Sequence, residues 1–177
     1  MNLEEMRKDC SVKQKNGIHF ILASIIIWTA VLIIHLTDMP ILSKNLFTFC
    51  CTAPLMPLAY LISKIIKVDF QNKDNPLTNL GILFSLNQIL YLLIAMWIYN
   101  AVPGKMVMVL AMIFGAHLLP YGWLYKSKSY TAFSIAIPVI VLFIGCNFPA
   151  YMVAAVMVIF EIVFSICLYQ ENRKMSI

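Results

Sequence analysis

The chain has 177 residues, of which 62% are apolar and only 12% are charged. A soluble domain is usually about 45–50% apolar and about 25% charged, so an ordinary water-soluble core is excluded. The same composition excludes a disordered chain, a collagen-like chain and a disulfide scaffold. The class that remains is an integral membrane protein.

Six apolar runs follow a mixed-charge tail at residues 1–16. A helix needs about 20 mostly apolar residues to cross about 30 Å of hydrocarbon, and the runs meet or nearly meet this length. We therefore predict an all-α fold, a polytopic bundle of six transmembrane helices joined by links too short for a soluble domain. The predicted spans are residues 17–37, 46–66, 77–99, 106–124, 130–146 and 150–169, followed by a tail at 170–177.

The net charge of +5 is a topology signal, because the basic residues lie between apolar runs and not on one face. Eleven of the thirteen Lys and Arg residues fall in or beside the two tails and the second and fourth links, whereas Lys44 and Lys105 fall on the other side. The positive-inside rule then predicts that both termini are cytoplasmic. In the tail at 1–16, Leu3, Met6 and Cys10 recur at helical spacing, which predicts a short interfacial amphipathic helix on the inner leaflet. A solvated tail is the alternative.

Glu161 is the most informative residue, because no other charge lies within nine residues of it. A carboxylate at the bilayer centre is costly unless it is paired, hydrated or protonated. Ser165 follows one turn later on the same face. The functional hypothesis is a proton carrier or a counter-ion for a cationic substrate. The alternative is a protonated glutamic acid that holds two helices together by a hydrogen bond.

Other polar residues occur at a similar depth in two further spans. His117 and Tyr121 share a face of the fourth span, and the adjacent Asn87 and Gln88 occupy the middle of the third. A polar layer near the midplane is how transporters hold a substrate, whereas hydrogen bonding between helices is the structural alternative. The predicted substrate or proton site comprises Glu161, His117, Gln88, Asn87, Tyr121 and Ser165.

Small residues and prolines predict how the helices are shaped. Ala111, Gly115 and Gly122 form a small-residue stripe on the fourth span, which allows another helix to approach closely. Pro54 and Pro57 lie three residues apart in the second span and predict a bend or a break there.

The sequence has no P-loop, GxSxG or HExxH motif and no cluster of Cys and His. We therefore assign no catalytic, cofactor-binding or metal-binding residue. The expected partners are the lipid bilayer, a small solute or a proton, and a second copy of the chain in a homodimer, with no nucleic acid.

The opening residues resemble those of a small uncharacterised family of bacterial multi-pass membrane proteins; they read MNLEEMRKDCSVKQKNGIHFILASIIIW. The resemblance implies a location in the bacterial inner membrane and supplies no function, so it assigns no site residue. Three hypotheses follow from the residues: a small transporter or permease, a non-catalytic sensor or assembly scaffold, and a membrane-embedded enzyme that modifies a lipid.

Overall fold

The computed structural model describes residues 1–175, and within this range it contains helices and no strand. The all-helical prediction is therefore confirmed for these residues. Two short 3-10 turns, η1 (Lys15–Gly17) and η2 (Pro103–Lys105), precede α2 and α6. The α-helices are α1 (Leu3–Lys13), α2 (Ile18–Leu36), α3 (Ile41–Thr52), α4 (Leu55–Ile65), α5 (Leu77–Ala101), α6 (Met106–Tyr125), α7 (Lys128–Asn147) and α8 (Ala150–Met175).

Five helical segments are long and apolar enough to cross a membrane, and α3 and α4 together would make a sixth if the bent pair is one span. Helix α8 continues to Met175, through most of the stretch predicted as a tail at 170–177, of which residues 176 and 177 lie outside the described residues. That all six segments cross a bilayer, with both termini on the cytoplasmic side, stays a prediction.

The second apolar run is broken, as its prolines predict. Helix α3 ends at Thr52, α4 begins at Leu55, and the two axes differ by 42°. Pro54 has no backbone N–H to continue the ladder of α3. The Thr52 hydroxyl donates to the carbonyl of Phe49 at 2.8 Å, and the Ala53 N–H donates to the same carbonyl at 3.3 Å. A side chain therefore helps to satisfy the end of the broken helix.

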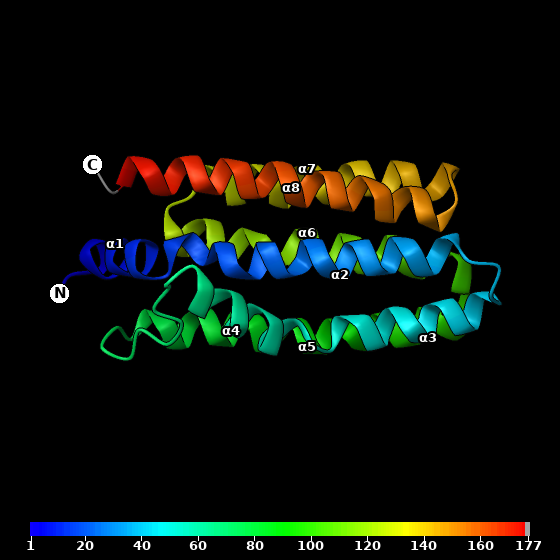
Figure 1. Cartoon of the computed structure of the whole chain (residues 1–177), viewed down its shortest axis with the longest axis horizontal. Coiled ribbons are helices and arrows are strands. Elements are labelled where there is room, and N and C mark those ends of the chain that lie inside the picture. Colours follow the sequence, from blue (N-terminus) through cyan, green and yellow to red (C-terminus); the bar gives the residue numbers. More distant parts are fainter. Residues whose placement is uncertain (176–177) are drawn as a thin grey trace.

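The helices run side by side along the long axis of the molecule, with α2 near the middle (Figure 1). Helix α2 packs against α8 and α4, and α6 packs against α7 and α5. The predicted small-residue stripe explains how α6 and α7 approach so closely. A Cβ atom at Gly115 would lie 2.7 Å from Cγ2 of Ile137, and one at Gly122 would lie 2.6 Å from Oγ1 of Thr131. Any side chain at either position would push the two helices apart.

Most of the positive charge gathers at one end of the bundle, which we call the basic end. It comprises residues 1–17, 64–76, 125–128 and 170–175, which hold eleven of the thirteen Lys and Arg residues. Figure 1 shows α1, the α4–α5 link, the α6–α7 link and the end of α8 together at this end. The segments that the positive-inside rule placed on one side therefore do lie at one end of the fold.

Helix α1 is fastened to the rest of the basic end by side-chain hydrogen bonds. The Asp9 carboxylate accepts from the side-chain amides of Asn72 and Asn75, both at 2.9 Å. The Ser11 hydroxyl donates to the carbonyl of Tyr125 at 2.7 Å, at the end of α6. These contacts explain why residues 3–13 form an ordered helix. Its position on a lipid surface stays a prediction.

The Asp9 carboxyl has a lowered pKa. Burial alone would raise its pKa, but hydrogen bonds from Asn72 and Asn75 and the ion pair with Lys13 at 2.9 Å outweigh that effect. The same pairing raises the pKa of Lys13. The charged form of Asp9 therefore stabilises the contact between α1 and the α4–α5 link.

A left-handed turn joins α1 to α2. Lys15, Asn16 and Gly17 have φ values of 46°, 51° and 66°. A Cβ atom at Gly17 would lie 3.1 Å from the hydroxyl of Tyr130 and 3.2 Å from Cε2 of Tyr125. Both the backbone angle and the crowding favour glycine at this position.

Candidate functional site

Glu161 lies on α8 where this helix packs against α2, and its side chain is fully buried. One carboxyl oxygen, Oε2, makes a short hydrogen bond with the hydroxyl of Ser24 on α2. Ser24 is buried as well. Glu161 is thus held between two helices of the bundle and not on its outer surface.

The hydroxyl of Ser24 also lies 2.8 Å from the carbonyl oxygen of Ile21, one turn earlier on α2. A hydroxyl carries a single proton and can donate to only one of these two acceptors at a time. When it donates to Ile21, a bond to Glu161 forms only if the glutamic acid carries the proton and donates it to Ser24. The contact is therefore compatible with both states of Glu161: an ionised carboxylate accepts from the Ser24 hydroxyl, and a protonated carboxyl donates to it.

The other oxygen of Glu161, Oε1, is buried and has no hydrogen-bond partner among the described residues. The same is true of the Ser165 hydroxyl, one turn further along α8 toward the basic end. A buried polar group without a partner costs about 1–3 kcal/mol. Two such groups lie four residues apart on one helix face, and buried polar groups of this kind are commonly satisfied by bound water in proteins.

His117 and Tyr121 belong to a second polar group, between α5 and α6. The Tyr121 hydroxyl donates to the carbonyl of Gly81 at 3.0 Å and lies 2.6 Å from the hydroxyl of Ser85. His117 lies one turn away on α6, where its Nδ1 is 2.5 Å from the carbonyl oxygen of Phe114. The imidazole and phenol rings are 5.9 Å apart, nearly perpendicular. The hydrogen bonds of Tyr121 join α5 to α6, whereas the contacts of His117 lie within α6.

Asn87 and Gln88 do not meet Glu161. Asn87 is exposed on the outer side of α5, where its amide donates to the hydroxyl of Tyr91 at 2.8 Å. Gln88 is half-buried on the same helix. Helix α5 packs mainly against α6, whereas α8 packs mainly against α2 and α7. The hydrogen bonds thus place Glu161 between α8 and α2, and Tyr121 between α6 and α5.

Two features of the polar interior were missed from the sequence. Ser24, the partner of Glu161, is a lone hydroxyl within the apolar run LASIII, and its depth close to that of Glu161 was the available signal. The second feature is a cluster of buried tyrosines at the basic end. Tyr125 donates to Oε1 of Gln14 at 2.8 Å, and its ring centroid lies 5.7 Å from that of Tyr130.

No group of three or more His, Cys, Asp or Glu side chains placed to hold a metal ion occurs within residues 1–175. What the Glu161 group offers chemically is one carboxyl that can gain or lose a proton, with the Ser24 hydroxyl bound to it.

The sequence model of a family of unknown function, DUF7010, matches residues 3–171. The chain belongs to this family. Searches of curated proteins and of solved structures found no match. The match covers α1 and nearly all of the bundle, so the Glu161 group and most of the basic end lie within the matched region.

Proposed function

We propose that this member of the DUF7010 family is a small transporter-type membrane protein in which Glu161 binds and releases a proton, or exchanges it for a small cation. The observation that carries the proposal is the buried carboxyl of Glu161, with one oxygen bound to Ser24 and the other facing no partner among residues 1–175. An ionisable residue inside an apolar bundle is costly, and such residues commonly mark ion or proton pathways.

The neighbouring hydroxyls support this role. Ser24 binds the carboxyl directly, and Ser165 lies one turn further along the same face of α8, so the polar side chains next to Glu161 add no charge of their own when it gains or loses a proton. The remaining polar group, around Tyr121 and His117, lies between α5 and α6 and is proposed as a part of the solute path. Asn87, which faces outward, has no part in it.

The proposal extends to topology and location. We propose six spans in a bacterial inner membrane, with the basic end in the cytoplasm. The gathering of eleven basic residues at one end supports this orientation. Labelling of single cysteines introduced at Lys128 and at Lys44 with a membrane-impermeant thiol reagent, in a cysteine-free background, tests it. Only the cysteine at Lys44 is expected to react from outside the cell.

Proton flux into liposomes tests the function. The purified protein is reconstituted with a pH-sensitive dye inside, and a potassium gradient with valinomycin imposes a membrane potential. The flux is measured without sodium and again with sodium added. We expect the wild-type protein to move protons in at least one of the two conditions, and Glu161→Gln to behave like empty liposomes in both. Thr29→Ala, which alters an exposed hydroxyl of α2 that donates to Ile25 within the same helix, is the matched control and should keep most of the flux. Equal flux in wild type and Glu161→Gln would refute the proposal.

A second candidate is a non-catalytic assembly protein, and α5 favours it. The outer side of this helix exposes Asn87 together with large apolar residues, including Leu90 and Trp97, of which 62% and 67% of the surface is uncovered. A polar amide facing lipid is unfavourable, whereas the same amide can bind a neighbouring helix. This candidate predicts a homodimer that Asn87→Leu weakens, measured by cross-linking in liposomes, with no proton flux.

A further inference from the structure

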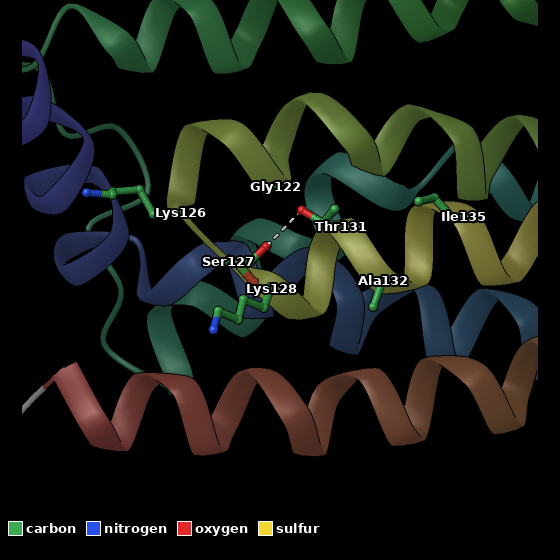
Figure 2. A pocket seen from close by; sticks show the side chains of 7 residues that line it. All are labelled: Gly122, Lys126, Ser127, Lys128, Thr131, Ala132 and Ile135. Carbon is green, nitrogen blue, oxygen red and sulfur yellow. Dashed lines mark hydrogen bonds between the residues drawn. The ribbon is translucent and has the colours of Figure 1, made fainter.

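A shallow groove lies between α6 and α7 at the basic end, separate from the Glu161 group. It has a volume of about 380 Å³, and its lining runs from charged to apolar. Figure 2 shows the lining residues at the start of α7 and the end of α6. They include Gly122, Lys126, Lys128, Thr131, Ala132 and Ile135.

We infer that this groove binds an anionic phospholipid, with the phosphate at the lysines and an acyl chain along the apolar part of α7. The order of the lining along α7 supports this choice of ligand. Lys128 comes first, Thr131 follows one turn later, and Ala132 and Ile135 continue along the apolar run, with Ile135 60% exposed. A phospholipid has a matching order of parts: a charged phosphate, then polar ester groups, then hydrocarbon chains.

The groove keeps only part of its positive charge. The Glu171 carboxylate lies beside it and accepts hydrogen bonds from Ser127 in the lining and from Ser129. Lys126 forms an ion pair with Glu4 on α1, but Lys128 has no carboxylate within ion-pair distance among residues 1–175. The start of α7 is already occupied, because the Ser129 N–H donates to Glu171 at 3.0 Å. The lysine ammonium groups, and not the end of the helix, therefore supply the attraction for a phosphate.

The floor of the groove depends on a missing side chain. A Cβ atom at Gly122 would lie 2.6 Å from Oγ1 of Thr131. The glycine lets the two helices meet at the bottom while the groove stays open along its length. A basic groove between membrane helices on the cytoplasmic side is where lipid headgroups are recognised. An inorganic phosphate would use the lysines alone and leave the apolar part of the groove uncovered.

Native mass spectrometry of the full-length protein in neutral detergent tests the inference. The probes are dioleoyl phosphatidylglycerol, dioleoyl phosphatidylcholine and inorganic phosphate, each titrated separately. We expect the phosphatidylglycerol complex to be retained more strongly than the phosphatidylcholine complex. Lys128→Gln should weaken retention of phosphatidylglycerol about fivefold, the effect of one lysine near a charged membrane surface. Lys174→Gln, at the exposed end of α8, is the charge-matched control and should change nothing.

Each alternative result overturns the inference. Equal retention of the two lipids would mean that the groove does not select an anionic headgroup. An equal loss for Lys128→Gln and Lys174→Gln would mean that net charge alone attracts the lipid. Competition by inorganic phosphate at the same concentration as the lipid would mean that the site recognises free phosphate. All three outcomes can be read whether or not Glu161 carries protons.

Discussion

Removing the hydroxyl of Ser24 should destabilise the bundle by about 1–2 kcal/mol. Ser24→Ala leaves Glu161 without its hydrogen-bond partner, and the other carboxyl oxygen already has none among the described residues. Leaving a buried polar group unpaired costs about 1–3 kcal/mol, whereas hydrogen bonds between membrane helices average about 0.6 kcal/mol in double-mutant cycles. The full burial of both side chains places the expected cost above that average.

Ser165→Ala is the matched control for this prediction. Both serines are buried and near Glu161, but the Ser165 hydroxyl has no partner within residues 1–175, so its removal should cost less than about 0.5 kcal/mol. The measurement is the free energy of unfolding in mixed micelles titrated with sodium dodecyl sulfate, followed by circular dichroism. Equal stability of Ser24→Ala and wild type, or an equal loss in both variants, would refute the hydrogen-bond argument.

Two further predictions concern the packing of α6 and the docking of α1. Gly115→Val should lower the free energy of unfolding by about 1–3 kcal/mol, because a Cβ atom there would lie 2.7 Å from Ile137. Gly104→Ala is the control and should change it little, because a Cβ atom there would have no atom within 4 Å. The same unfolding assay measures both variants. The lowered pKa of Asp9 means that its charged form stabilises the docked α1 above the pKa of about 3.9 in the unfolded chain, and that this contribution is lost as the pH falls through the lower, folded pKa. Protection of the α1 amides from hydrogen exchange, relative to the intrinsic rate at each pH, should therefore fall below about pH 4 in the wild type and be low already at neutral pH in Asp9→Asn; unchanged protection in that variant would contradict the prediction.

Glu161→Gln separates a structural role of Glu161 from a functional one. If Glu161 is protonated, the amide has nearly the same shape and can make the same bond to Ser24 in either direction. We therefore expect the variant to unfold within about 1 kcal/mol of wild type while it loses proton flux. A large loss of stability with little change in flux would instead assign Glu161 to holding α2 and α8 together.

The helices and their breaks could be predicted from the sequence because they depend on local chemistry. A helix formed in every predicted apolar segment, the break fell at Pro54, and the small residues of α6 met α7. Each of these features follows from residues close together in the chain. Packing partners do not: Trp28, far from either end of its helix, is buried with its ring 6.2 Å from that of Phe114, and nothing in its own segment indicates α6 as its neighbour.

The sequence predicts how deep each polar residue lies along its helix. That depth alone does not determine which side chains come into contact. Residues of different helices share a level in the bundle whenever their distances from the helix ends agree, but contact also requires neighbouring helices and matching rotation. Asn87 satisfies the first condition and fails the others, because it turns outward from α5. Ser24 satisfies all three, since α2 and α8 run side by side with both residues on the shared face. A sequence gives the rotation of one helix from its own pattern, but the pairing of α2 with α8 arises from the packing of the whole bundle, and that pairing is what brings a hydroxyl to Glu161.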